Sequence, residues 1–139
     1  LFRQIALIRP ETTFGRSRFD FYIEGDGRKM FMEVKGATLE ERNVVRFPDA
    51  PTERGLKHIR ELEACLERGF EACVLFVIQM KDVDHFEPNR ITHKAFGDAL
   101  YRADCAGVQV LARDCRVTPD SMEIADPVPV RLPAPAEPF

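Results

Sequence analysis

The chain has 139 residues, of which 45% are hydrophobic and 31% charged, the balance of an ordinary globular domain with a workable core. This length and composition exclude a disordered tail, a collagen-like repeat and a disulfide-held miniprotein. The longest apolar run, residues 72–78, has the length of a strand. It is far below the roughly 20 residues that cross a bilayer, so no membrane partner is predicted. Because the chain begins at Leu1 rather than Met, we expect it to be part of a longer protein.

Charge is unevenly distributed along the chain. The formal net charge is −3, but residues 1–60 hold 12 Lys and Arg against 9 Asp and Glu, whereas residues 61–139 hold 8 against 14. The chain as a whole is therefore not a basic nucleic-acid-binding protein. Its first half can still place one basic face on a mildly acidic body.

The four cysteines, Cys65, Cys73, Cys105 and Cys115, stand apart and form no C-x-x-C pair. A zinc site needs closely spaced pairs of Cys or His, and the three scattered histidines do not supply them either. Cys65 and Cys73 lie in or next to apolar periodic stretches, where free cysteine packs as a small hydrophobic residue. This usage predicts buried, reduced thiols in a cytoplasmic protein.

The first 35 residues predict strands. Residues 4–9, 18–24 and 29–35 alternate apolar with other side chains, the period of a half-buried strand. A Gly-Asp-Gly sequence between the last two supplies the positive φ angles of a tight turn, which predicts an antiparallel hairpin. Residues 11–15 are expected to be a connection.

The remaining segments alternate helices with strands. In chain order we predict a loop over 36–51, an amphipathic helix over 53–68, a fully apolar and therefore buried strand over 72–80, a loop over 81–89, a second helix from Thr92 to just before Gly107, and a strand over 108–112. This order predicts an α/β domain, a mixed β-sheet flanked by helices, over residues 1–126. Five of the ten prolines fall in residues 127–139, which predicts an extended, loosely held tail.

Three polar residues of the hairpin can form a site. Period-2 geometry places Glu33 and Lys35 on one side of their strand, and pairing can bring Asp20 beside them. Two carboxylates suit a hard cation such as Mg²⁺, which also takes water and phosphate oxygens. The ammonium group can orient the attacking water, so the spacing fits a metal-dependent phosphodiester hydrolase. The alternative is a solvated face on which Lys35 pairs weakly with Glu33.

These residues carry a resemblance to a known family. Asp20 followed thirteen residues later by Glu33-Val34-Lys35 resembles the PD-(D/E)XK signature of restriction-endonuclease-like domains, with Phe19 in place of its Pro. The longer segments RPETTFGRSRFDFYIE, MEVKGATL, RFPDAPTERGLKHIREL, VLFVIQM and GVQVLA, in this order, resemble the sugar fermentation stimulation protein A family. The resemblance covers nearly all of residues 3–113.

The resemblance implies a restriction-endonuclease-like core and assigns roles to the hairpin residues. Asp20 and Glu33 match the metal-binding acids, for Mg²⁺ or Mn²⁺, and Lys35 matches the catalytic lysine. Glu11 is an additional candidate for a metal-binding acid. The family also implies an N-terminal OB-fold-like domain absent from this chain, and a bacterial or archaeal DNA-binding protein linked to regulation of maltose metabolism.

A TERGLKH-like segment shared with the family opens the first predicted helix. Its N-terminal N–H groups, together with Arg54 and Lys57, suit a phosphate, although the two cations can equally be a solvated helix face. His58 is a candidate for nucleic-acid binding or general-base chemistry, but a lone His is more often structural. Arg16, Arg18 and Arg46 are further candidates for phosphate contacts. Asp49 is either a cap or turn residue or a metal ligand.

The leading hypothesis is a DNA-binding, metal-dependent nuclease, with RNA as a second possible substrate. A non-catalytic DNA-binding regulator that uses the nuclease fold as a scaffold is the alternative, and a protein-interaction module is a third. Many nuclease-like domains dimerise, so a homodimer stays open. The complete acid, acid, lysine set favours catalysis.

Overall fold

A computed structural model describes residues 1–135 of the chain. The larger of two sheets has the strand order β1-β2-β3-β6-β8-β9, with bounds Ile5–Phe14, Ser17–Gly25, Arg28–Ala37, Glu71–Ile78, Gln109–Val117 and Met122–Pro127. β3–β6 and β6–β8 pair in parallel and the other neighbours antiparallel, so the sheet is mixed, as predicted. The smaller sheet has the order β4-β5-β7, with bounds Leu39–Glu41, Val44–Phe47 and His85–Pro88.

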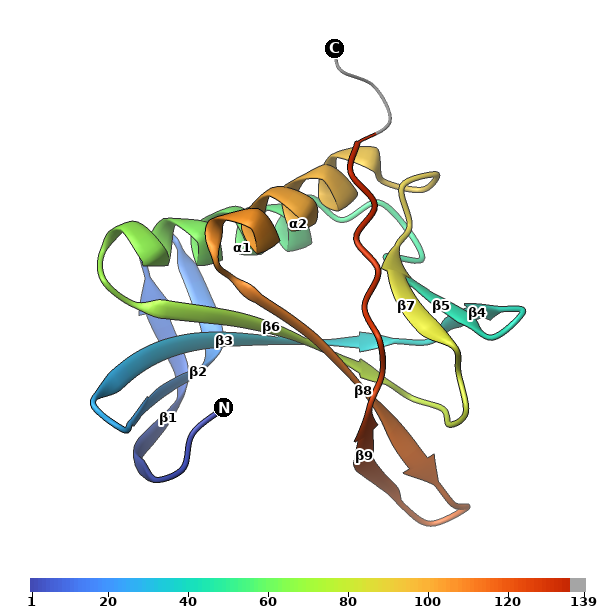
Figure 1. Cartoon of the computed structure of the whole chain (residues 1–139), viewed down its shortest axis with the longest axis horizontal. Coiled ribbons are helices and arrows are strands. Elements are labelled where there is room, and N and C mark those ends of the chain that lie inside the picture. The colour runs from blue at the N-terminus through green and yellow to red at the C-terminus, as the bar shows by residue number, and fades with distance from the viewer. Residues whose placement is uncertain (136–139) are drawn as a thin grey trace.

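Two helices make the parallel crossovers, α1 (Glu53–Glu67) from β3 to β6 and α2 (Lys94–Ala106) from β6 to β8. They lie side by side on one face of the larger sheet (Figure 1). The opposite face is only partly covered, since Leu75 and Val77 of β6 are half-buried there. The expectation that this central strand is covered on both faces is therefore met fully only on the helix side.

The helices begin and end where the sequence predicts, to within two residues. Thr52 is the N-cap of α1, and its hydroxyl accepts a hydrogen bond from the Gly55 N–H at 2.9 Å. Gly107 follows α2 with φ 118°, a left-handed conformation that favours glycine. The predicted hairpin turn is also confirmed, because Gly25 pairs with Arg28 across two residues of positive φ.

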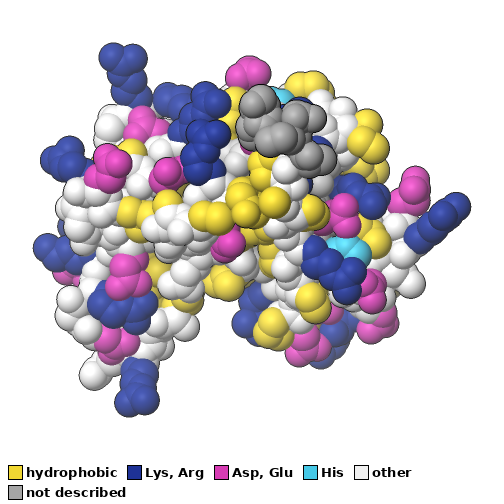
Figure 2. Space-filling view, turned by 45° about the horizontal axis from the view of Figure 1, so that its top comes forward, with side chains coloured by type: hydrophobic (Ala, Val, Ile, Leu, Met, Phe, Trp, Pro, Cys, Tyr) yellow, Lys and Arg dark blue, Asp and Glu magenta, His cyan; other side chains and the backbone are white. Residues whose placement is uncertain are grey.

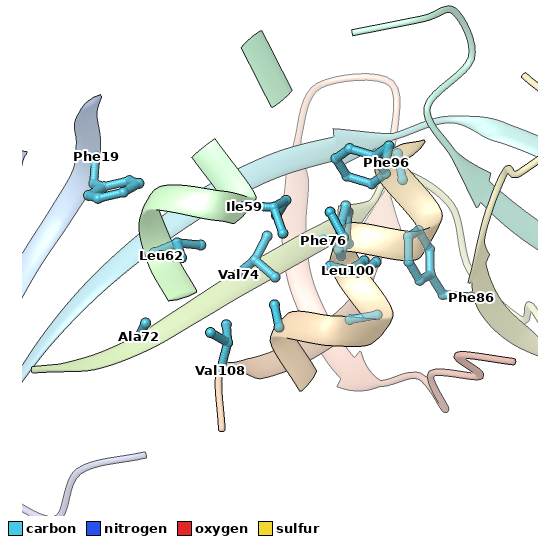
Figure 3. Close-up of a cluster of buried hydrophobic side chains, with 14 of the residues drawn as sticks. Phe19, Ile59, Leu62, Ala72, Val74, Phe76, Phe86, Phe96, Leu100 and Val108 are labelled. Atoms are coloured by element: carbon cyan, nitrogen blue, oxygen red, sulfur yellow. The ribbon is translucent and has the colours of Figure 1, made fainter. Parts of the chain in front are cut away.

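The core lies between the helices and the sheet (Figure 3). Ile59 and Leu62 of α1 face Val74 and Phe76 of β6, and all four side chains are completely buried. Phe19 of β2 is buried at the edge of this cluster, where it contacts the ring of His58 at 6.0 Å between centroids. On the outer surface shown in Figure 2, positive and negative side chains are interspersed.

Several segments predicted as loops are strands. β1 continues through residues 11–14 and contains Pro10. An edge strand tolerates proline, because no second neighbouring strand needs the N–H that proline lacks. β4 and β5 lie within residues 36–51, joined by a two-residue turn at Arg42 and Asn43, both with positive φ. β7 lies within residues 81–89. β4, β5 and β7 have only three or four residues each, too few for a detectable alternation.

The C-terminal part differs from the prediction as well. β8 extends beyond residue 112 and pairs with β9. After β9, the Val128 N–H donates to the Ala112 carbonyl at 2.9 Å, and the Arg131 N–H donates to the Phe86 carbonyl at 2.9 Å. The expectation of a loosely held tail is therefore wrong for residues 128–131, which run beside β7 (Figure 1). Residues 136–139 lie outside the described part of the chain.

None of the helices in residues 1–135 combines the length and the hydrophobicity that crossing a membrane requires.

The core predicts the cost of one substitution. The Phe76 ring stacks on Phe86 at 4.3 Å and contacts Phe47 at 5.4 Å, so Phe76→Ala leaves a cavity among rings that cannot close it. We expect the free energy of unfolding to fall by about 3–5 kcal/mol, measured by urea denaturation. Ile91→Ala, at a fully exposed position, is the control and should change it little. Equal losses in the two variants would contradict this description of the core.

Candidate functional site

The site forms where β2 separates from β3. Backbone pairing between these strands ends at Phe21 and Met32, and side chains bridge the gap beyond it. The Val34 N–H donates to Asp20 Oδ2 at 2.7 Å, and the Asp20 N–H donates to Glu33 Oε1 at 3.3 Å. Backbone N–H groups of the two strands thus fix both carboxylates at the gap.

Lys35 joins the same cluster. β3 points Glu33 and Lys35 toward the helix layer, and Lys35 Nζ lies 3.4 Å from Glu33 Oε2. Glu33 is only 5% exposed, which does not fit a solvated sheet face. The structure therefore brings together the three residues that the hairpin pattern singled out.

Helix α1 adds His58 to this cluster. His58 Nδ1 lies 2.8 Å from Glu33 Oε2, but the two groups are not aligned, so this buried nitrogen has no hydrogen-bond partner among the described residues. Burial, followed by the charges of Lys35, Arg54 and Lys57, lowers the pKa of His58. The neutral imidazole is therefore favoured.

Glu33 is perturbed in the opposite direction. Burial raises the pKa of the Glu33 carboxyl above its usual value; nearby Lys35 opposes this rise and the Asp20 carboxylate adds to it. A buried carboxylate with a raised pKa is costly in its charged form, and a cation is the usual compensation. Lys35 supplies part of that compensation.

A cavity of about 520 Å³ opens beside the cluster. It is lined by Glu11, Arg16, Ser17, Arg18, Phe19, Asp20, Arg54, Lys57 and His58. Four of these side chains are cations and two are carboxylates, so the walls favour an anionic ligand. Asp20 and His58 line the cavity and also contact Glu33, so they connect the two.

The predicted phosphate contacts divide into those at this cavity and those elsewhere. Arg16, Arg18, Arg54 and Lys57 line it. Arg46 does not, because it lies on β5, forms an ion pair with Glu87 at 3.4 Å and lines a separate cavity beside the smaller sheet.

The two additional acids have different surroundings from the central pair. Glu11 is at the cavity, where its largely exposed carboxylate pairs with Arg18 at 3.4 Å. Asp49 is exposed, and the cap of α1 is Thr52 instead. Neither acid joins Asp20 and Glu33 through a hydrogen bond in the described structure.

Two residues at the site are not identified by the sequence patterns. Ser17 is 2% exposed and lines the cavity. Its position two residues before Phe19 places it on the same buried face of β2, which is the sequence pattern that could have identified it. Glu61 accepts a hydrogen bond from the Arg16 N–H at 3.2 Å, a contact between distant segments that no local pattern announces.

The donors present fit a hard divalent cation. Mg²⁺ and Mn²⁺ bind through one or two carboxylates and complete their shells with water and phosphate oxygens, and Asp20 and Glu33 provide two adjacent carboxylates. Within residues 1–135, however, no three Asp, Glu, His or Cys side chains converge closely enough to form a complete cage.

The mixed sheet with its helix crossovers, and the acid, acid, lysine set where two strands separate, define a restriction-endonuclease-like domain. The family model of the sugar fermentation stimulation protein RE domain matches residues 1–121, and the chain belongs to this family.

Relatives and a solved structure agree with this assignment. Sugar fermentation stimulation protein homologs from Desulfitobacterium hafniense strain Y51 and from Clostridium beijerinckii are 58% and 55% identical to it over 131 and 132 residues. These matches cover 94% and 95% of the chain and 58% of each relative, so the chain spans little more than half of their length. Pyrococcus furiosus SfsA, solved in complex with Ca²⁺, superposes with a TM-score of 0.87 at 28% identity, over 93% of this chain and 56% of that one.

The electrostatics of the cluster make a testable prediction. Lys35→Met removes the cation 3.4 Å from Glu33, so the pKa of Glu33 should rise further above its usual value. A raised carboxyl pKa contributes stability below the unfolded-state pKa and loses it as the pH rises through the folded-state pKa. The variant should therefore lose stability relative to wild type as the pH increases toward neutrality.

Carboxyl carbon NMR titration of Glu33 checks the shift directly. Lys29→Met, which removes an exposed cation from the same strand, is the matched control and should leave the Glu33 titration unchanged. An unaltered Glu33 pKa in Lys35→Met would contradict the coupling.

Proposed function

We propose that this chain is the hydrolytic domain of a DNA-binding protein that cleaves phosphodiester bonds with Mg²⁺ or Mn²⁺. The observation that carries the proposal is the set formed by Asp20, Glu33 and Lys35, in which Glu33 is buried and Asp20 lines a cavity rich in cations. Its link to the regulation of sugar metabolism, maltose in particular, is the role expected from the family.

Each residue has a distinct task in this proposal. Asp20 and Glu33 would hold the metal, which when bound lowers the pKa of a water and offsets charge on the phosphate. Lys35, beside Glu33, orients the attacking water and stabilises negative charge that develops on the phosphate oxygens. The cations that line the cavity hold the nucleic-acid strand against Asp20 and Glu33.

The Ca²⁺ bound by Pyrococcus furiosus SfsA supports a divalent-cation site in this chain as well. Ca²⁺ and Mg²⁺ both prefer oxygen ligands, and they differ mainly in size and in the number of ligands they take. With only two carboxylates next to each other, the cluster suits a cation that keeps several waters, which favours Mg²⁺ or Mn²⁺ for the reaction.

The second candidate function is a DNA-binding regulator without catalysis. Glu33 already accepts hydrogen bonds from the Asp20 N–H and from Lys35, so the cluster can be a purely structural network. In that case the cavity binds the nucleic-acid backbone, and the acids hold β2 and β3 in place.

A cytoplasmic location is part of the same proposal. All four cysteines are free, and Cys65 and Cys73 are completely buried. Burial raises the pKa of each of these two thiols to about 12, so both stay protonated and unreactive. Free cysteines agree with a reducing compartment.

Metal binding tests the proposed ligands first. Glu33→Gln removes one of two carboxylates with little change of shape, so the affinity for Mn²⁺ should fall at least about tenfold, since even outer-shell changes cost 10–100-fold. Isothermal titration calorimetry measures it, and Glu41→Gln, at an exposed site on β4, is the control. Unchanged Mn²⁺ binding in Glu33→Gln would remove Glu33 from the ligand set.

Cleavage tests the activity. Labelled single- and double-stranded DNA and RNA are incubated with the protein and Mg²⁺ or Mn²⁺, beside EDTA controls. Lys35→Ala should slow cutting by about 10²–10³-fold, the usual cost of losing a group that stabilises transition-state charge. Lys29→Ala should cut like wild type. Salt-sensitive binding without any cutting would instead favour the regulator.

A further inference from the structure

The inner wall of the cavity contains a hydroxyl with no partner. Ser17 is 2% exposed, and its Oγ makes no hydrogen bond within the described structure. A buried hydroxyl without a partner is unfavourable, so such groups in native proteins have a functional or ligand-related explanation. Since Ser17 lines the cavity, a molecule bound in the cavity can supply the partner.

We propose that Ser17, Arg16 and Arg54 form a subsite for a second phosphate of the nucleic-acid strand, apart from the phosphate that is cleaved. The inference rests on the proposed function for the identity of the strand. The chemistry of the subsite, a phosphate that accepts from the Ser17 hydroxyl and pairs with two guanidinium groups, follows from residues that line one cavity.

The charges at the cavity are not all equally available. Arg18 is paired with Glu11, and Lys57 Nζ donates to the Arg16 carbonyl at 2.6 Å. The guanidinium groups of Arg16 and Arg54 make no hydrogen bond or ion pair in the part of the chain that the structure describes. These two groups are therefore free to bind a phosphate, and arginine suits phosphate geometry.

The position of Ser17 indicates a second phosphate. Ser17 precedes Asp20 by three residues on β2, which separates their backbones by roughly 10 Å at strand spacing. One phosphate group is too small to contact both Ser17 and a metal held by Asp20 and Glu33. A strand that places its scissile phosphate at the acids can reach Ser17 with a neighbouring phosphate.

The subsite is held in shape by α1. Glu61 accepts a hydrogen bond from the Arg16 N–H at 3.2 Å, and Lys57 donates one to the Arg16 carbonyl. Both backbone polar groups of this turn residue are therefore fixed. At Gly15, φ is +60°, and a Cβ would lie 3.0 Å from Glu61 Oε2. The turn is thus packed directly on α1, which places Arg16 and Ser17 before any ligand binds.

Binding in the absence of metal tests the subsite. Fluorescence anisotropy with a short single-stranded oligothymidylate in EDTA, over a range of salt concentrations, gives the affinity and its salt dependence. Ser17→Ala should weaken binding roughly tenfold, the effect of one hydrogen bond to a charged group, and leave the salt slope unchanged. Arg54→Met should weaken binding and reduce the slope by about 0.7.

Matched controls separate the subsite from general charge and folding effects. Arg60→Met removes an exposed cation from the same helix outside the cavity and should change neither quantity as much as Arg54→Met. Ser17→Ala should melt at the same temperature as wild type or higher, because it removes an unsatisfied buried hydroxyl. A folded Ser17→Ala variant with weaker binding therefore supports a ligand contact.

Three results would overturn the inference: wild-type affinity in Ser17→Ala, equal slopes in Arg54→Met and Arg60→Met, or no binding by the wild-type protein. The failure of the proposed function is distinguishable, because the measurement needs neither metal nor cleavage. If the protein never cuts but Ser17→Ala and Arg54→Met still weaken binding as expected, the subsite stands and belongs to a regulator.

Discussion

The hydrogen bond from the Val34 N–H to the Asp20 carboxylate is the contact on which the site depends. A strand that leaves its neighbour exposes backbone groups, and these must be paired before the gap can be buried. Asp20 satisfies one such group with its side chain and is thereby fixed beside Glu33. The gap between β2 and β3 interrupts the sheet, and the Asp20 and Glu33 carboxylates are held there in fixed positions.

The helix layer turns this gap into a chemical environment. The parallel pairing of β3 with β6 requires a crossover, and α1 provides it by packing over β6 and the neighbouring strands β2 and β3. The same helix buries Glu33, supplies His58, and carries Arg54 and Lys57 at the cavity. Burial strengthens every charge interaction in the cluster, because less water is present to screen it. Fold and electrostatics therefore have one origin, the placement of α1.

The sequence was sufficient for the features that repeat with a fixed period. The alternation around Glu33 and Lys35 and the spacing of Leu56, Ile59 and Leu62 gave the hairpin and α1, and with them the central cluster. Contacts between distant segments were not accessible in this way. Arg46 has the same side chain as Arg54, but tertiary structure pairs it with Glu87 within the smaller sheet, at the opposite end from the β1–β2 turn (Figure 1). Alternation also implies the burial of Ser17, but only the tertiary structure shows that its hydroxyl has no hydrogen-bond partner among the described residues.

The strand order has a consequence for synthesis on the ribosome. β3 leaves the ribosome long before β6, because β4, β5 and α1 come between them in the chain. Until β6 emerges, β3 has one unpaired edge, and α1 lacks the strand against which its apolar side is buried. Every residue of the cluster will have been synthesised by then, but the surroundings that define it will not exist. The nascent chain thus acquires its charged centre only when a later strand, apolar from residue 72 to residue 78, pairs with β3.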